Sequence, residues 1–190
     1  MEDEFIKKLK KVYGRYKFAF NLNLEDKTIL AIIITHVKFE TNFLNISEKF
    51  TYSNNRFKSI FPKYYEELKD ILPCKNKKCE RLIADKIYNR IGGYMYRGRG
   101  YIQLTGKYNY KKVNNYLKNK MLINFNLIKY PDLILDDEVI SMLVLLAFWD
   151  INNINKNKDI HKSIRIINPY INKVDKSRRV EYFNNIIRGV

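Results

Sequence analysis

Two apolar segments place the strongest constraint on how this chain can fold. Residues 29–37 are apolar on nearly every side when they are placed on a helix, and Asp26 is suited to cap the start of that helix. Residues 137–149 form a second strongly apolar segment of helical length. A helix that is apolar all round is normally buried. A chain of 190 residues has room for one well-buried domain around two such helices and is short for two domains.

The remaining sequence is also mostly helical in pattern. Further segments place apolar residues on one helical face and polar residues on the other. They are residues 5–13, 56–61, 64–72, 81–91, 108–118 and 176–187. Gly92-Gly93 is expected to end the helix over 81–91, and residues 101–104 are expected to form a short strand. The sequence therefore predicts a mainly α fold, a single domain over residues 1–190 with at most a small β-hairpin.

The charge of the chain narrows the kind of partner that it can have. The 36 Lys and Arg residues outnumber the 20 Asp and Glu residues, so the formal net charge is +16. The abundance of Lys, Asn, Ile and Tyr is typical of an AT-rich genome, which explains part of the Lys content but not the shortage of acids. We therefore expect an anionic partner: nucleic acid, a membrane surface or an acidic cell-wall polymer.

The hydropathy pattern predicts no stable membrane insertion. The longest apolar run, residues 29–34, is far shorter than the roughly 20 residues that cross a bilayer. The first four residues, Met-Glu-Asp-Glu, are acidic where a secretory signal is basic. We expect a protein that is made in the cytoplasm without a visible export signal, unless a signal has been removed.

Two cysteines and two histidines are too few for a convincing metal site. Cys74 and Cys79 are separated by four residues, so they can close a small disulfide loop or remain free thiols. Only His36 and His161 are available to complete a zinc site with them. The sequence therefore predicts no structural metal, and it leaves the state of the cysteines open.

Glu40 is the first candidate for chemistry. By spacing it shares a helical face with Ile33 and Val37, one turn beyond the apolar segment. The negative end of the helix dipole and the apolar neighbours both favour a protonated carboxyl group, which a general acid needs. The alternative interpretation is a surface glutamate at the point where the helix leaves the core.

Glu48 follows eight residues later in a polar segment beside Lys49. A loop carboxylate in these surroundings is expected to stay ionised. Two carboxyl groups in unlike environments are the arrangement that glycoside hydrolysis uses: one protonates the leaving oxygen and the other acts on the opposite face of the sugar. Two glutamates at this spacing are a weak pattern by themselves.

The segment from Tyr96 to Gly106 is more informative. It reads Tyr-Arg-Gly-Arg-Gly-Tyr-Ile-Gln-Leu-Thr-Gly, and its glycines allow the backbone to pass close to a ligand. On a strand, Gln103 and Thr105 would point to the same side and could hold a water molecule or a sugar amide. A single Arg-Gly repeat does not match the long repeated tracts that bind RNA. A packed hairpin with two satisfied polar residues is the alternative interpretation.

Residues 97–110 resemble the signature of glycoside hydrolase family 19, which includes chitinases and phage-type endolysins of the lysozyme-like superfamily. The resemblance continues at 130–133 with 141–149, which are similar to the family's Asn-Pro-Asp-Leu and Phe-Trp segments. Further similar segments are residues 52–62, 83–88, 166–168 and Arg179 with Tyr182. The similarity covers most of the chain, from about Leu30 to Phe183, and implies a lysozyme-like fold.

The resemblance also implies catalytic roles. Glu40 matches the general acid of the family's His-Glu-Ser/Thr-Gly-Gly-Phe motif, although Phe39 replaces the histidine and one glycine is missing. This form is also similar to goose-type lysozymes and lytic transglycosylases. Glu48 matches the general base, and Thr105 matches the hydroxyl residue that holds the attacking water. His36 does not match the family's histidine, so we interpret it as structural.

The resemblance implies further roles in binding the substrate. Gln103, Tyr108, Asn109 and Asn168 match positions that contact the sugars. Arg179 matches a basic residue that supports the carboxylates. The Ile-Asn-Gly-Gly segment of the chitinases reads Ile-Asn-Pro-Tyr at residues 167–170, so the contacts at this edge differ from theirs.

Taken together, the residues and the resemblance predict an inverting glycoside hydrolase that cleaves β-1,4 bonds of amino-sugar polymers and needs neither a metal nor an organic cofactor. We expect the substrate to be peptidoglycan, as for an endolysin, and the enzyme to be a monomer that acts on a wall outside the cytoplasm. A chitinase is the first alternative, and a non-catalytic cationic wall binder is the second. A nucleic-acid partner is no longer expected, because the Arg-Gly segment belongs to the hydrolase signature.

Overall fold

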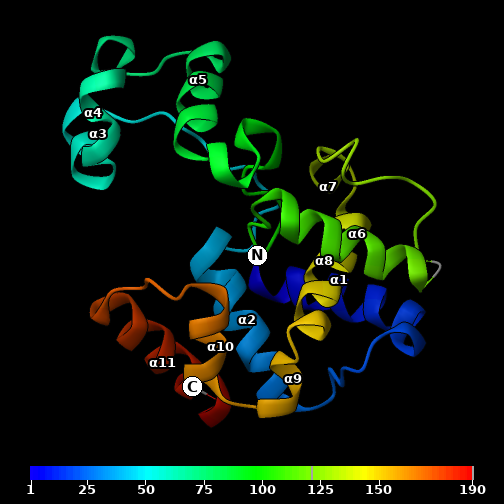
Figure 1. The fold of residues 1–190 in the computed structure, drawn as a ribbon. Helices are drawn as coiled ribbons and strands as arrows, with labels where there is room; N and C mark the ends of the chain where they lie inside the picture. Colours follow the sequence, from blue (N-terminus) through cyan, green and yellow to red (C-terminus); the bar gives the residue numbers. More distant parts are fainter. Residues whose placement is uncertain (121, 190) are drawn as a thin grey trace.

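The computed structural model describes residues 1–120 and 122–189, and it is almost entirely helical (Figure 1). The α-helices are α1 (Glu2–Tyr16), α2 (Lys27–Thr41), α3 (Asn54–Ile60), α4 (Pro62–Leu68), α5 (Lys77–Ile87), α6 (Lys107–Asn119), α7 (Leu133–Asp136), α8 (Glu138–Ile151), α9 (Ile154–Asn157), α10 (Ile160–Ile167) and α11 (Lys173–Arg188). Four 3₁₀ turns join them: η1 (Lys17–Ala19), η2 (Lys69–Ile71), η3 (Asn89–Ile91) and η4 (Gly93–Tyr96). The predicted mainly α fold is confirmed.

The two apolar segments form the centre of the larger of two lobes. Helices α2 and α8 are buried on nearly all sides, as their composition predicts. The side chain of Asp26 accepts hydrogen bonds from the first backbone N–H groups of α2, and Asp137 does the same for α8. Helices α10 and α11 pack against α2, while α1 and α6 pack against α8. This core therefore fixes both ends of α2, including the end that carries Glu40.

Helices α3, α4 and α5 form a smaller lobe that stands apart from the other helices (Figure 1). Its separate core contains the fully buried side chains of Phe50, Phe57 and Ile83. Cys74 and Cys79 form a disulfide next to this core, which decides between the two states that the sequence leaves open. The small lobe thus has its own hydrophobic cluster, and its contact with the large lobe runs through the chain segments near residues 48 and 88–98.

The predicted strand over residues 101–104 is wrong. Residues 100–103 form a tight loop that is closed by two backbone hydrogen bonds between Arg99 and Leu104, with N···O distances of 3.3 and 2.9 Å. Gly100 and Gln103 have positive φ angles of 77° and 50°, which a strand cannot accommodate. The structure therefore has isolated bridges in place of a strand, within the limit of a small hairpin that the sequence sets.

The predicted helices agree with the structure in position, and their ends differ. The segment over 81–91 ends as α5 at Ile87 and continues only as the turn η3, and the one over 64–72 divides into α4 and η2. The short helices α7, α9 and α10 are not predicted from the sequence. Within residues 1–120 and 122–189, no helix has the length and apolar character needed to span a bilayer.

Candidate active site

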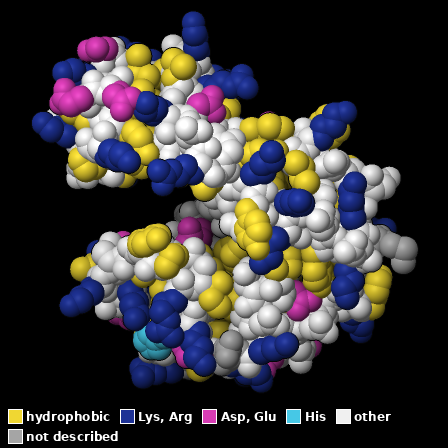
Figure 2. Space-filling model, in the orientation of Figure 1, with side chains coloured by type: hydrophobic (Ala, Val, Ile, Leu, Met, Phe, Trp, Pro, Cys, Tyr) yellow, Lys and Arg dark blue, Asp and Glu magenta, His cyan; other side chains and the backbone are white. Residues whose placement is uncertain are grey.

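A deep cleft separates the two lobes, and it contains most of the predicted site residues. Figure 2 shows the cleft as a notch with acidic side chains at its base. Its volume is about 1380 Å³, and its lining includes Glu40, Glu48, Gln103, Thr105, Tyr108, Asn109 and Asn168. These residues come from four separate parts of the chain. Arg179, the remaining predicted residue, does not line the cleft but lies behind Glu40.

Glu40 lies in the last turn of α2, where the chain leaves the large core. Asn42 ends the helix in a left-handed conformation, with a φ of 51°. An oxygen of Glu40 lies 2.8 Å from Nη2 of Arg179, whose side chain comes from α11 and is buried. The spacing predicts apolar surroundings for Glu40, and the structure places against it the guanidinium of Arg179, the basic residue that the resemblance assigns to the support of the carboxylates. The ring of Phe39 lies 5.4 Å from the same guanidinium.

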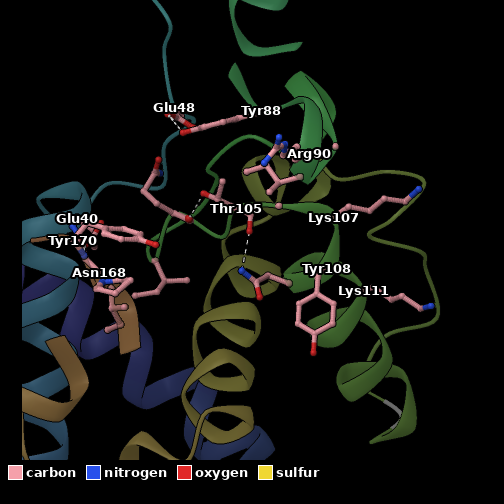
Figure 3. Close-up of a pocket in the computed structure, with 18 of the residues that line it drawn as sticks. Glu40, Glu48, Tyr88, Arg90, Thr105, Lys107, Tyr108, Lys111, Asn168 and Tyr170 are labelled. Carbon is pink, nitrogen blue, oxygen red and sulfur yellow. Dashed lines mark hydrogen bonds between the residues drawn. The ribbon is translucent and has the colours of Figure 1, made fainter. Parts of the chain in front are cut away.

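Glu48 lies in the irregular segment between α2 and α3 and is held by neutral donors. The hydroxyl of Tyr88 donates to Oε1 at 2.8 Å (Figure 3). The backbone N–H of Gly98 donates to Oε2 at 3.1 Å. The backbone N–H of Glu48 in turn donates to the carbonyl of Gly98 at 2.8 Å. Burial and the nearby Glu48 carboxylate raise the pKa of Tyr88 well above its usual range, so Tyr88 remains a donor.

Thr105 and Gln103 face the cleft from the loop that follows Gly98. The hydroxyl of Thr105 donates to the carbonyl of Gln103 at 2.7 Å, so its oxygen keeps lone pairs for another donor. The side-chain amide of Gln103 donates to the carbonyl of Ile46 at 2.9 Å and ties the loop to the Glu48 segment. A Cβ on Gly98 would lie 2.7 Å from Oε1 of Gln103 and 3.2 Å from Oγ1 of Thr105. Only glycine therefore fits at position 98 without moving both side chains.

The two arginines of the Arg-Gly segment are used inside the protein. Arg99 is buried, and its Nε donates to Oδ1 of Asp132 at 2.7 Å. Arg97 donates to the same oxygen at 3.2 Å and to the hydroxyl of Ser47 at 2.7 Å. These contacts hold the segment that carries Gly98 against the segment that carries Glu48. The arginines thus shape the site without facing the cleft.

The predicted sugar-contacting residues occupy two sides of the cleft. The Asn109 amide donates to the carbonyl of Thr105 at 2.9 Å, while Tyr108 is 72% exposed beside it. Asn168 ends α10 and accepts a hydrogen bond from the backbone of Tyr170, whose side chain is 94% exposed at the cleft mouth. Exposed aromatic rings at a cleft are suited to packing against sugar faces.

The sequence analysis missed several lining residues. Tyr88 lies in a segment that the resemblance covers, but no role was assigned to it. Arg90, Lys107, Lys111 and Tyr170 also line the cleft. Lys107 and Tyr170 lie in segments that the resemblance covers, but no role was assigned to them, because only long-range packing brings η3, α6 and the 167–170 segment together.

The site offers two carboxyl groups and a hydroxyl around one open space. Glu40 is paired with a cation, whereas Glu48 is held by two neutral hydrogen-bond donors, so the two groups are in unlike environments. Two carboxyl groups that line one open space can give a proton on one side of a bound molecule and take one on the other. In the part of the chain that the structure describes, no three His, Cys, Asp or Glu side chains converge as a metal site would require.

The sequence matches a family model. The model of glycoside hydrolase family 19, described as "Chitinase class I", matches residues 74–189. A Haemophilus influenzae protein described as a glycosyl hydrolase family 19 domain-containing protein is 30% identical over 146 residues. That alignment covers 70% of this chain and 66% of the relative, so the chain spans just under two thirds of that protein's length.

Solved structures of chitinases share the fold. A bacterial family 19 chitinase matches with a TM-score of 0.60 at 19% identity, covering 97% of this chain and 84% of its own. Chitinase C from Streptomyces griseus matches with a TM-score of 0.58 at 20% identity, covering 97% and 82%. A class IV chitinase from Zea mays matches with a TM-score of 0.57 at 21% identity, covering 97% and 79%. The family model covers more than half of the sequence, and the chain therefore belongs to glycoside hydrolase family 19.

Proposed function

We propose that the protein is an inverting glycoside hydrolase that cleaves β-1,4 bonds in amino-sugar polymers. The observation that carries this proposal is that Glu40 and Glu48 line one cleft in unlike environments. Membership of the family supports it. Inverting hydrolysis needs one carboxylic acid and one carboxylate on opposite sides of the scissile bond, with space for a water molecule.

In this mechanism Glu40 donates its proton to the glycosidic oxygen as the bond from that oxygen to the anomeric carbon breaks. The nearby Arg179 stabilises the Glu40 carboxylate that forms. Glu48 takes a proton from a water molecule, and that water forms the new bond to the anomeric carbon from the opposite face. Thr105 accepts the water's second hydrogen, since its own hydroxyl hydrogen is directed to Gln103. No covalent intermediate is formed.

Product analysis tests this mechanism. The purified protein is incubated with peptidoglycan and with chitin oligosaccharides, and the products are examined by mass spectrometry and by NMR of the anomeric proton. We expect reducing ends that first appear as the α-anomer. Products with 1,6-anhydro ends would identify a lytic transglycosylase, and retained β-anomers would contradict the inverting mechanism.

We propose peptidoglycan as the substrate because of charge. Arg90, Lys107 and Lys111 line the cleft, and within the described residues none of the three forms a salt bridge. Lys107 and Lys111 lie on the opposite side of Thr105 from Glu40 (Figure 3). Peptidoglycan carries carboxylates on its lactyl-linked peptides, whereas chitin is uncharged. The net charge of +16 favours the same polymer.

A charge reversal tests this choice. For Lys107→Glu/Lys111→Glu we expect KM for peptidoglycan to rise and its salt dependence to weaken, with no change for chitin oligosaccharides. The control is Lys7→Glu/Lys11→Glu, which reverses two exposed lysines at the same spacing on α1. Equal increases in KM for the two double variants would show that the cleft lysines act only through the net charge of the protein.

Chitin is the second candidate substrate. The family model and the similar solved structures are described as chitinases, which favours it. Release of sugars from chitin oligosaccharides without lysis of peptidoglycan would select it. We further propose that the active unit is a monomer and that the reaction takes place at a wall outside the cytoplasm.

A further inference from the structure

A chain of four polar side chains runs from the core of the large lobe to the cleft. Nε2 of His36 lies 2.9 Å from Oγ of Ser163, and Nδ1 of His36 lies 3.1 Å from Nη1 of Arg179. Nη2 of Arg179 then lies 2.8 Å from Glu40. His36 and Glu40 are four residues apart on one face of α2, while Ser163 lies on α10 and Arg179 on α11.

The hydrogen-bond donors and acceptors in this series of four side chains fix the tautomer of His36. A guanidinium group only donates, so Nδ1 of His36 must accept from Arg179 and cannot carry a hydrogen. Ser163 donates its own hydroxyl hydrogen to the carbonyl of Ile160 at 2.8 Å, so its oxygen is the acceptor for His36. Nε2 must therefore carry the ring's single hydrogen, and the imidazole is neutral.

We propose that His36, as the neutral Nε2–H tautomer locked by Ser163, is a positioning residue that holds the Arg179 guanidinium against Glu40. This inference rests on the proposed role of Glu40 as the acid. It assigns to His36 a function that the sequence analysis did not give it. His36 reaches no substrate and acts through Arg179.

Burial makes His36 one of the few anchors that Arg179 has. His36 is fully buried, and Arg179 is 5% exposed. Besides its contact with His36 and its ion pair with Glu40, the guanidinium lies over the ring of Phe39, and among the described residues its Nε has no hydrogen-bond partner. Loss of the histidine acceptor would leave a buried N–H group unpaired and free the guanidinium to turn away from Glu40.

The surroundings of His36 keep it neutral. The ring centroids of His36 and Trp149 lie 5.8 Å apart at an interplanar angle of 61°, and the charged guanidinium of Arg179 touches Nδ1 of His36. Burial, together with the positive charge of Arg179, lowers the pKa of His36 to about 3. A protonated ring would direct an N–H group at the guanidinium, so the acceptor role and the neutral state require each other.

NMR of the protein without substrate tests the tautomer. With only two histidines in the chain, the ¹⁵N signals of His36 can be separated from those of His161. We expect an unprotonated Nδ1 and a protonated Nε2 between pH 5 and pH 8, and slowed rotation of the Arg179 guanidinium. A doubly protonated ring, or a hydrogen on Nδ1, would overturn the proposal whatever the protein hydrolyses.

Kinetics of three variants test the positioning role. His36→Leu removes the acceptor, and we expect kcat to fall roughly 10- to 100-fold with KM nearly unchanged, because a small misplacement of the acid affects the transition state. His36→Asn can place an amide oxygen near the position of Nδ1 and should recover most of kcat and the slowed guanidinium rotation. Ser163→Ala removes only the tautomer lock and should have a smaller effect than His36→Leu.

A matched control separates positioning from packing. Thr35→Val changes a fully buried polar residue next to His36 whose hydroxyl bonds only within α2, to the carbonyl of Ala31. It should leave kcat and the Arg179 signals unchanged. Wild-type kcat in folded His36→Leu would overturn the proposal, and so would equal kcat losses in His36→Leu and Thr35→Val. Wild-type protein that cleaves no amino-sugar polymer would instead refute the proposed function, and the NMR test would still stand.

Discussion

The two lobes each hold one of the two glutamates, and they hold them in different ways. Glu40 extends from a helix in the middle of the larger core, and a buried guanidinium neutralises it. Glu48 lies in an irregular segment, where a tyrosine from the small lobe and one backbone N–H hold it. Glu40 is thus placed by a helix and a buried charge, and Glu48 by neutral hydrogen bonds between two irregular segments.

This difference follows from how much apolar surface each lobe buries. The large lobe contains two helices that are buried all round, whereas the small lobe packs three short helices on a cluster of aromatic side chains. A smaller core gives lower local stability. We therefore expect the small lobe to open first and to take the support of Glu48 with it.

Removal of either carboxyl group should have the largest effect on activity. For Glu40→Gln and for Glu48→Gln we expect kcat to fall by about 10²- to 10⁴-fold with the fold unchanged, since each variant loses proton transfer in the transition state. Reducing-end assays with circular dichroism as the folding check measure this. Full activity in Glu48→Gln would show that the small lobe takes no part in the chemistry.

Cavities in the two cores should separate the lobes by stability. Phe57→Ala and Leu145→Ala each remove a fully buried side chain and should cost about 2–5 kcal/mol. In Phe57→Ala we expect fast hydrogen exchange confined to α3, α4 and α5, with α2 and α8 still protected. In Leu145→Ala protection should fall throughout the chain. If protection from hydrogen exchange fell throughout the chain in both variants, the two lobes would unfold as one unit.

The large core was predictable because its signal is local. The apolar runs of α2 and α8, together with Asp26 ahead of α2, define buried helices within single windows of sequence. The small helices α9 and α10 were missed, since a few apolar residues do not distinguish a short helix from a loop. Residues 101–104 were predicted as a strand because the sequence pattern alone does not show that Gln103 has a positive φ.

The site was predictable only in part. The residues themselves indicated Glu40, Glu48 and Thr105 as candidates, and the resemblance supplied their roles. The structure places all three around one cleft, but their roles remain predictions. The partners of His36 lie 127 and 143 residues away in sequence, so spacing could reveal its relation to Glu40 and nothing more. Tyr88 and Glu48 are 40 residues apart in the sequence, and only the packing of α5 brings the Tyr88 hydroxyl to the Glu48 carboxylate.

Acidification should weaken the large lobe selectively. The unfolded chain takes up a proton on His36 near its ordinary pKa of 6.5, whereas the folded chain does so only at about 3. The free energy of unfolding therefore falls as the pH falls through this range, and His36 should contribute a loss of about 2 kcal/mol between pH 7 and pH 5. Urea unfolding of wild type and His36→Asn measures it. If the free energy of unfolding fell equally in the two proteins, His36 would not be the cause of the loss.

Reduction should weaken the small lobe instead. The Cys74–Cys79 disulfide closes a short loop beside the small core, and constraint of the unfolded chain by such a loop is worth about 2 kcal/mol. With a reductant, hydrogen exchange should accelerate in α3, α4 and α5 and stay unchanged in α2 and α8. A Cys74→Ser/Cys79→Ser variant should exchange like the reduced protein and ignore the reductant. Acceleration in α2 would contradict the separation of the lobes.

Tyr88→Phe should have the smallest effect and is the most direct test of how the small lobe holds Glu48. It removes one hydroxyl donor to the carboxylate and leaves the ring and the Gly98 N–H in place. A hydrogen bond to a charged group is worth about 1.5–3 kcal/mol, and since Gly98 still binds the other oxygen we expect a loss near the lower end, roughly tenfold in kcat. The control is Tyr52→Phe, because Tyr52 belongs to the same aromatic cluster but makes no hydrogen bond to Glu48. If both variants keep wild-type kcat, the backbone of the large lobe's loop suffices to hold Glu48, and the difference between the two glutamates is smaller than their contacts indicate.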